Sequence, residues 1–464
     1  MKIMTGLFDH MVLQRARRGG SDAPITGEVQ TNGPVLATVR TAHGLLRGCR
    51  ARTIGRADNG KFTARLKGLP PGGPYRITLS VTDAKTAVTD RQIVRDVLVG
   101  DVWIIAGQSN AEGYGRLADR AKPQRMTRAF YMDDHWAVAE DPMHCLAESV
   151  DQVHVDLCGG VRPPRNKLTG VGPGVAFGQQ MHRTTGLPQG LIASAHGGTS
   201  LLQWDPAKRA DGSKSLYGAT LRRIAKNGGK IAGIVWYQGE SECNPTDAAL
   251  YVPRMQTLVA SFRQDLGQSN LPFVCVQLSR FVTSDTAAGA AWQRVREEQR
   301  LLPEKIQHFA TVPAIDLTLD DIIHISGRDQ QVLGRRLAQA MLALLKHPRA
   351  SLPPITLRRI RRRATEQELQ IILEFGQVAG KLEAGGRPLG FYLRDRSGAP
   401  LLYDTRLDGS RAMVYCSQLS RAAKDPTSLQ IGYGAGTDPS CNIHDSAGRS
   451  LPAFGPIRLV DESA

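Results

Sequence analysis

The chain has 464 residues, a formal net charge of +16 at pH 7, 41% hydrophobic residues and 22% charged residues. This balance is typical of a folded globular protein and excludes a disordered chain, and the length leaves room for roughly two to four domains. No apolar run approaches the ~18 residues needed to cross a bilayer, so we expect no membrane-spanning segment.

The first predicted region covers residues 1–97. Its short β-type runs, such as 34–39 and 75–81, alternate with turn sequences rich in Gly, Pro, Asn and Asp. Regular short strands with such punctuation are typical of a small β-sandwich. We therefore expect an N-terminal β-sandwich-like domain.

The second predicted region, residues 98–350, alternates apolar strand candidates with helical patterns. Met255, Leu258 and Phe262 follow helical spacing, and a similar pattern begins at Leu333. Strands that alternate with helices predict an α/β domain whose parallel sheet is covered on both faces. The strand candidates are 102–106, 190–194, 231–237, 273–278 and 309–314.

The third predicted region, residues 351–464, returns to β character, with runs at 369–375 and 390–393. We expect a C-terminal β-rich domain there. This region also contains the densest basic run, RRIRRR, from Arg358 to Arg363. Because no nucleic-acid recognition motif accompanies it, we interpret it as a solvated strand or linker face rather than a phosphate-binding patch.

The central region contains a first candidate site segment, GDVWIIAGQSNAEGYG, at residues 100–115. Its apolar run ends abruptly in Gly107, Gln108, Ser109 and Asn110. One interpretation is an ordinary turn, because all of these residues are common in turns. The other is a nucleophile, Ser109, because open α/β sheets place their sites beyond the carboxyl ends of strands.

Two further candidate segments follow later strands of the central region. The first contains Gly197 and Gly198, and paired glycines let backbone N–H groups approach a ligand closely. A tight strand-to-helix turn is its alternative interpretation. The other contains Gln238 and Glu240, which follow directly where an apolar run stops. A helix start rich in hydrogen-bond acceptors is the alternative there.

The last candidate segment, DDIIH, contains Asp320, Asp321 and His324. A carboxylate three residues before a histidine can hold one imidazole nitrogen while the other nitrogen faces a nucleophile. The three-residue offset favours Asp321, with Asp320 as a competitor. The order Ser, Asp, His is one of several that build the same catalytic triad. Elsewhere we find no tight metal-ligand spacing, and the seven cysteines contain no zinc-type pair, so we expect no metal.

Taken together, these segments resemble the sialate O-acetylesterase family, carbohydrate acetylesterases of the SGNH hydrolase superfamily. The motifs GDVWIIAGQSNAEGYG, HGGTSLLQW, WYQGESE and DDIIH occur in the family's order. LFDHMVLQR near one end and CNIHDSAGRSLPAFGPIRL near the other resemble the family's flanking domains. The resemblance covers nearly the whole chain and implies a three-layer, parallel-sheet SGNH-hydrolase-like catalytic domain between the two β-rich domains.

The resemblance also implies roles for individual residues. Ser109 would be the nucleophile, His324 the general base and then acid, and Asp321 the residue that orients His324. The implied oxyanion-hole donors are the N–H of Ser109, an N–H of the Gly197–Gly198 turn and the side chain of Gln238. The usual Asn of the superfamily's third block is not evident, so Gln238 is assigned its role. Ile325 follows His324 where proline is common in the family.

The implied activity is that of a serine esterase that removes O-acetyl groups from acetylated carbohydrates through an acetyl-enzyme, without a cofactor. Tyr114, Trp204 and Glu240 are the substrate-binding candidates. An acetylated sugar or glycan is the expected partner, and we expect neither nucleic acid nor membrane. Acetylxylan or another glycan remains an alternative substrate to sialate, and a non-catalytic glycan-binding protein is the alternative class. The resemblance suggests a periplasmic or secreted location, although no signal peptide is visible; the oligomeric state is open.

Overall fold

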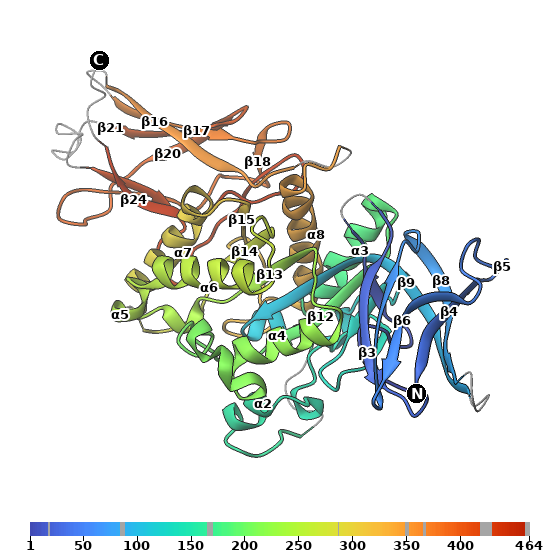
Figure 1. The fold of residues 1–464 in the computed structure, drawn as a ribbon. Coiled ribbons are helices and arrows are strands. Elements are labelled where there is room, and N and C mark those ends of the chain that lie inside the picture. Colours follow the sequence, from blue (N-terminus) through green and yellow to red (C-terminus); the bar gives the residue numbers. More distant parts are fainter. Residues whose placement is uncertain are drawn as a thin grey trace.

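A computed structural model describes residues 1–16, 19–83, 89–164, 170–285, 287–348, 352–364, 368–417 and 429–459. Helices occupy the middle of the molecule, and β-rich regions lie at its two ends (Figure 1). Among the described residues, no helix combines the length and apolar character needed to cross a membrane. The central α/β region positions the candidate site.

The central sheet is mixed, with an edge strand that runs against the others. Its strands follow the order β11-β10-β12-β9-β13-β14-β15, and all neighbouring pairs are parallel except β10 with β11. Each predicted strand of this region overlaps an observed one, and three of them extend one or two residues beyond it. The strands are β9 (Thr89–Gly107), β10 (Thr127–Phe130), β11 (Trp136–Val138), β12 (Gln189–Ala195), β13 (Gly233–Tyr237), β14 (Phe273–Gln277) and β15 (Phe309–Pro313).

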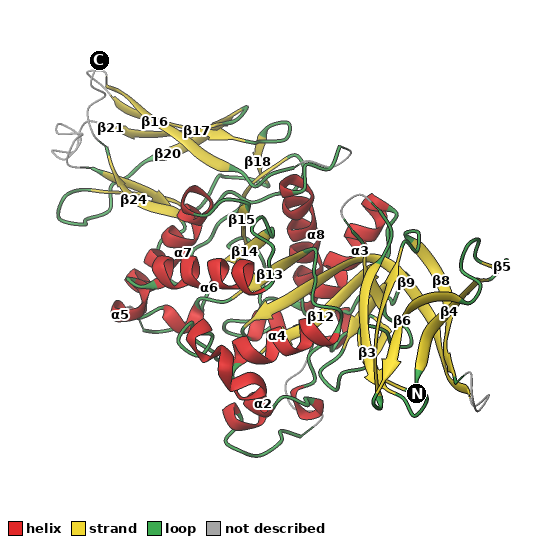
Figure 2. Ribbon diagram, viewed as in Figure 1, coloured by secondary structure: helices red, strands yellow, loops and turns green. Residues whose placement is uncertain are grey.

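Helices pack on both faces of this sheet (Figure 2). On one face α3 (Gly174–Thr185) packs against α8 (Gly327–Leu344), and on the other lie α4 (Leu216–Lys226), α6 (Tyr251–Asp265) and α7 (Ala288–Lys305). The strands between them are buried throughout, which explains their continuous apolar sequences. The helical spacing in the sequence therefore predicted α6 and α8 correctly. The short helices are α1 (Ser109–Glu112), α2 (Gln152–Leu157) and α5 (Pro245–Ala248).

The N-terminal strands form a sheet that continues into the central one and is antiparallel except where β2 pairs with β9. Their order is β1-β3-β7-β6-β4-β8-β9, so β9 belongs to both parts and crosses residue 97, where the sequence suggested a boundary. One hydrophobic core likewise includes residues from both parts. The strands are β1 (Lys2–Thr5), β2 (Val12–Gln14), β3 (Asp22–Glu28), β4 (Gly33–Thr41), β5 (Gly44–Leu45), β6 (Arg52–Asp58), β7 (Lys61–Lys67) and β8 (Gly72–Thr82).

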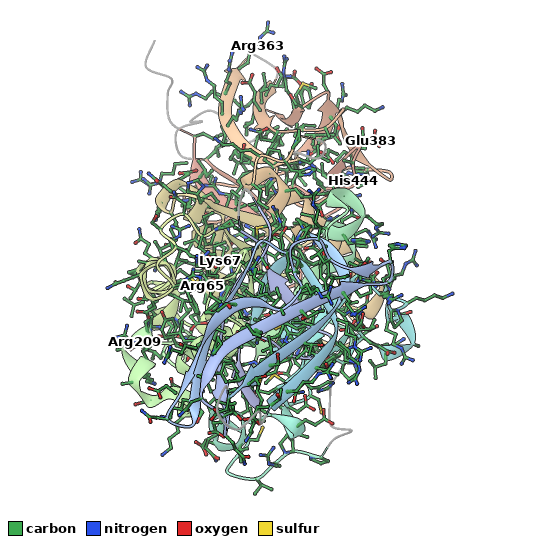
Figure 3. All side chains as sticks on the ribbon, turned by 45° about the vertical axis from the view of Figure 1, so that its right-hand side comes forward. Arg65, Lys67, Arg209, Arg363, Glu383 and His444 are labelled. Carbon is green, nitrogen blue, oxygen red and sulfur yellow. The ribbon has the colours of Figure 1, made fainter. Side chains whose placement is uncertain are left out.

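The C-terminal region is built from small antiparallel sheets around a core of its own. The basic run lies in β16, an edge strand, where Arg358, Arg359, Arg361 and Arg363 are exposed. Figure 3 shows Arg363 at the outer end of this region. The strands are β16 (Thr356–Ala364), β17 (Glu368–Gly376), β18 (Leu382–Ala384), β19 (Phe391–Arg394), β20 (Asp404–Asp408), β21 (Arg411–Ser417), β22 (Gln430–Tyr433), β23 (Ile443–Asp445) and β24 (Phe454–Arg458).

Candidate active site

A sharp turn after β9 delivers Ser109 to the carboxyl edge of the central sheet. The turn depends on Gly107, whose φ is +128° and whose missing Cβ would lie 2.0 Å from the carbonyl oxygen of Tyr237. No side chain fits there, because both the conformation and the space exclude one. Ser109 then begins the single turn of α1 and is 9% exposed. Ser109 therefore stands beyond the carboxyl end of a strand, where a site was expected, and its role as nucleophile stays a prediction.

The neighbouring residue, Asn110, ties this turn to the loop that carries His324. The Asn110 amide donates to the carbonyl oxygen of Ile323 at 3.3 Å, and its side-chain oxygen accepts the N–H of Ile325 at 2.9 Å. The same amide donates to Oε1 of Glu240 at 3.0 Å. Asn110 is fully buried. Its side chain therefore forms hydrogen bonds with the backbone on both sides of His324.

Asp321 holds His324 in a fixed orientation. Oδ2 of Asp321 lies 2.7 Å from Nδ1 of His324, and Oδ1 accepts the backbone N–H groups of Ile323 and His324. Partial burial by itself would raise the pKa of Asp321, but these hydrogen bonds outweigh it and place the pKa below its ordinary value. Asp321 is therefore a carboxylate at neutral pH, suited to stabilise a charged imidazole.

Asp320 has a different task from its neighbour. Its Oδ2 accepts the backbone N–H groups of Arg116 at 2.7 Å and Gly327 at 2.9 Å. The carboxylate thus joins the start of α8 to the segment after α1. Of the two candidates, the structure places Asp321 against the imidazole.

Tyr114 lies against His324, and Gly197 lies close to both Tyr114 and Ser109. The Tyr114 ring stacks on the His324 ring with centroids 4.3 Å apart. A Cβ on Gly197 would lie 3.1 Å from the Tyr114 hydroxyl and 3.4 Å from the Ser109 Cβ. These residues therefore form one continuous cluster. Ser109 Oγ and His324 Nε2 make no hydrogen bond with each other in this structure.

Backbone donors for an oxyanion are available at Ser109 and Gly198 but not at Gly197. Within the described part of the chain, the N–H groups of Ser109 and Gly198 have no acceptor. The Gly197 N–H instead donates to Oε2 of Glu112 at 2.6 Å. The prediction of Gly197 as a free donor is corrected by this contact, because a buried carboxyl already occupies its N–H.

Gln238 does not serve as predicted either. Its amide nitrogen donates to the carbonyl oxygen of Thr199 at 3.1 Å and to the Glu242 carboxyl, and the side chain is fully buried. Tyr251 and Gln299 both donate to its backbone carbonyl oxygen. The predicted oxyanion role of Gln238 is thus wrong in this structure: its donors support the loop that follows Gly198.

The substrate-binding candidates Trp204 and Tyr114 differ in their burial. Trp204 is fully buried, packs edge-on against Trp236 with centroids 5.0 Å apart and donates to Thr199 at 3.1 Å. It cannot stack on a sugar, and that prediction is corrected: an aromatic residue close to a site in sequence is here part of the core. Tyr114 is half-buried beside His324, and its substrate role stays a prediction.

Glu240 lies in the site, where its side chain contacts Asn110. Asn110 donates to its Oε1, while its Oε2 is buried and has no hydrogen-bond partner in the described part of the chain. Burial raises the pKa of Glu240 to about 7, and the Asn110 amide opposes that rise. Its substrate contact stays a prediction. Among the described residues, no group of three or more His, Cys, Asp or Glu side chains is arranged for a metal ion.

Sequence reasoning missed the roles of Asn110 and Glu112. Both stand in the first motif, directly after Ser109 in the chain or within its helical turn. Because asparagine is common in turns, the sequence alone gives no sign of the role of Asn110. Glu112 carried a signal of its own, because a carboxylate placed within a turn that ends a buried strand needs a specific partner.

Comparison with known proteins supports one family. The model of the family described as carbohydrate esterase, sialic acid-specific acetylesterase, matches residues 99–343. A protein of Arabidopsis thaliana named probable carbohydrate esterase is 29% identical over 265 residues, which cover 52% of this chain and 90% of that protein. Human sialate O-acetylesterase is 27% identical over 369 residues, or 72% of this chain and 69% of the human protein.

A solved structure shares the overall fold. The crystal structure of a carbohydrate acetylesterase from Xanthomonas citri has a TM-score of 0.71 to this chain and covers 98% of each chain, at 22% sequence identity. The agreement extends over the β-rich regions as well as the central sheet.

Proposed function

Because this chain belongs to the sialic acid-specific acetylesterase family of carbohydrate esterases, and is therefore a carboxylic ester hydrolase, we propose that Ser109, His324 and Asp321 are its catalytic residues. The reaction is the removal of O-acetyl groups from carbohydrates through an acetyl-enzyme. The single observation that supports this proposal is the imidazole of His324, which Asp321 holds at Nδ1 and which stacks on Tyr114 in the cluster that includes Gly197 and Ser109.

Acylation begins when His324 Nε2 takes the proton of the Ser109 hydroxyl. Asp321 fixes the tautomer that leaves Nε2 free as a base and stabilises the imidazolium that forms. Ser109 Oγ attacks the ester carbonyl carbon, and the carbonyl oxygen becomes an oxyanion near the N–H groups of Ser109 and Gly198. The C–O bond to the sugar then breaks, and the imidazolium returns the proton to the sugar oxygen.

Deacylation repeats these steps with water. His324 removes a proton from water, the hydroxide attacks the acetyl carbon, and Ser109 leaves as an alcohol after receiving the proton. The products are acetate and the deacetylated sugar. Every proton is carried by His324, so the chain's own residues suffice for the sequence of steps.

The finer architectural expectations are part of the same proposal. We assign residues 98–350 to an SGNH-hydrolase-like catalytic domain, flanked by β-rich domains at 1–97 and 351–464. The parallel order of β12, β9, β13, β14 and β15 supports the assignment, as does the position of Ser109 directly after β9. The first boundary lies inside β9, so the N-terminal and catalytic domains share that strand.

The test is acetate release from a panel of O-acetylated carbohydrates, with an O-acetylated sialic acid and acetylated xylan side by side. We expect Ser109→Ala to abolish release from whichever substrate is cut, and to leave the melting temperature unchanged because it removes only one hydroxyl. Ser397→Ala, in an exposed turn of the C-terminal region, is the matched control and should keep full activity.

Two outcomes count against the proposal. Turnover by Ser109→Ala near the wild-type rate would show that Ser109 is not the nucleophile. Binding of glycans by the wild-type protein, with no acetate release from any of them, would favour a non-catalytic glycan-binding protein instead.

A further inference from the structure

Glu112 is a carboxyl group buried beside the proposed nucleophile and not used by the mechanism above. It ends the same helical turn that Ser109 begins, and it is 3% exposed. Its Oε2 accepts the Gly197 N–H at 2.6 Å. With the described residues Glu112 forms no ion pair. A carboxylate in such a place is costly, because burial without a cation disfavours the charged form.

The contact fixes the strand end that borders Ser109. The position of a Cβ on Gly197 would be 3.2 Å from Oε2 of Glu112, 3.1 Å from the Tyr114 hydroxyl and 3.4 Å from the Ser109 Cβ. The carboxyl, the phenol and the nucleophile thus surround one glycine. A shift of Gly197 would move Gly198, whose N–H is one of the two unoccupied donors of the proposed oxyanion hole.

The charge of Glu112 is set by its surroundings. Burial raises its pKa to about 8, and the Gly197 N–H lowers it only in part. A neutral carboxyl still accepts a hydrogen bond through its carbonyl oxygen. An ionised one would add a buried negative charge next to the place where the negative oxyanion develops, and like charges at short range in a buried site repel strongly.

Two buried histidines and the Tyr114 phenol near Glu112 keep their charge between pH 7 and pH 9. Burial lowers the pKa of His196, which precedes Gly197, to about 4, and that of His144 also to about 4. Burial raises the pKa of the Tyr114 phenol well above its ordinary value, and the charge of Glu112 adds to that rise. His324, stacked on Tyr114, is the proposed base.

We propose that Glu112 is a positioning residue that holds the Gly197–Gly198 turn in place while it is uncharged, and whose ionisation suppresses the esterase. This inference rests on the proposed function, because its main readout is acetyl-ester hydrolysis. The direction of the pH dependence follows because Glu112 is an acid. It is protonated below its pKa and ionised above it, so activity falls as the pH rises.

The first test compares pH profiles of kcat for wild type and Glu112→Gln. The glutamine amide oxygen can accept the Gly197 N–H and stays neutral at every pH. We expect the wild-type kcat to decline roughly tenfold per pH unit above about pH 8. Glu112→Gln should keep its plateau through pH 9 and match the wild type within a few-fold at pH 7.

A second variant tests the hydrogen bond rather than the charge. Glu112→Leu is neutral but cannot accept the Gly197 N–H, so the turn loses its support. We expect kcat at pH 7 to fall by roughly 10²-fold, as for a misplaced catalytic group, with KM within about threefold and no alkaline decline. This variant keeps the inference testable if Glu112→Gln does not fold.

Two other buried carboxyls serve as matched controls. Burial raises the pKa of Glu240 and of Asp141 to about 7 each. Glu240→Gln and Asp141→Asn should therefore retain the wild-type decline above pH 8. If either control removes that decline, the titrating group is that carboxyl and the inference about Glu112 is overturned.

Protein stability provides a readout that does not require turnover. The folded pKa of Glu112 lies above its unfolded value of about 4.3, so the wild type loses stability as the pH rises from there to about 8. Glu112→Gln lacks that loss, and its melting temperature relative to wild type should rise between pH 5 and pH 8. If the difference in melting temperature between the two proteins stays constant from pH 5 to pH 8, Glu112 is not a buried neutral carboxyl.

The two proposals fail in different ways. An alkaline decline that persists unchanged in Glu112→Gln, with turnover still dependent on Ser109, overturns the role of Glu112 and leaves the proposed function intact. Turnover that survives Ser109→Ala overturns the proposed function and the inference built on it.

Discussion

Two adjacent aspartates in the DDIIH segment perform separate tasks, and substitutions should separate them. Asp321→Asn removes the carboxylate that fixes the His324 tautomer, so we expect kcat to fall by roughly 10²–10⁴ with little change in KM. Asp320→Asn weakens the contacts to the N–H groups of Arg116 and Gly327 and removes the ion pair with the Arg116 side chain, and should keep kcat within a few-fold. Steady-state kinetics on both variants decide the assignment. The reverse pattern would make Asp320 the orienting residue.

Asp321 also links stability to pH. Its pKa lies below the ordinary value, so its folded-state contacts stabilise the protein above the unfolded pKa. That contribution is lost as the pH falls through the folded pKa. Because the side chain is half exposed, solvent screening keeps the contribution small.

Gln238 shows how a buried amide differs from a catalytic donor. Gln238→Ala leaves the Thr199 carbonyl oxygen and the Glu242 carboxyl without that donor, so we expect the free energy of unfolding to fall by about 1–3 kcal/mol. Turnover of the folded enzyme should stay within a few-fold of wild type. Chemical denaturation and kcat on one preparation test this. A loss of 10²–10³ in kcat at unchanged stability would instead restore Gln238 as an oxyanion donor.

At the scale of elements, Asn110 joins α1 to the loop before α8. Asn110→Ala leaves the buried N–H of Ile325 without its acceptor, so unfolding should become easier by about 1–3 kcal/mol. The loop carrying His324 also loses its anchor, and kcat should fall as well. Ser326→Ala is the control: it removes the N-cap of α8, costs about 1 kcal/mol and should leave kcat nearly unchanged. Equal kinetic losses in both variants would contradict the anchoring role of Asn110.

The sequence predicted elements better than contacts, and the site shows why. The strands of the central sheet could be predicted because buried parallel strands are continuous apolar runs. The Asp321–His324 pair could also be predicted, because both partners lie within one short loop. The state of the Gly197 N–H could not, since its acceptor, Glu112, is 85 residues away in the chain. The Gln238 amide is similar, because its bond to Thr199 joins two loops that meet only in the fold.

At the scale of the whole molecule, Arg296 of α7 joins the C-terminal region to the central sheet. It is 1% exposed and donates to carbonyl oxygens on both sides of the junction: Leu278, Ser279, Gly434, Gly436 and Thr437. Burial lowers the pKa of Arg296 to about 10, which leaves it charged at neutral pH. One buried cation therefore donates hydrogen bonds to backbone carbonyl oxygens of both regions.

Arg296→Leu should loosen that junction. Several carbonyl oxygens would be left buried without a donor, so we expect a loss on the order of 3 kcal/mol and a separate, earlier unfolding transition of the C-terminal region by calorimetry. Arg294→Leu, a half-exposed arginine on the same helix, is the control and should unfold like the wild type. A single transition at the wild-type temperature in Arg296→Leu would show that the junction does not depend on this residue.

The shared strand β9 also has a consequence for biosynthesis. Its first half pairs with β8 and β2, which are already made when β9 leaves the ribosome. Among the described residues, its second half, the apolar run that leads to Ser109, pairs only with β12 and β13, which begin at Gln189 and Gly233. During synthesis the nascent chain therefore holds a half-finished sheet with an unpaired apolar edge. Such an edge can pair with other chains, so the segment that leads to Ser109 is open to aggregation until β12 and β13 are made.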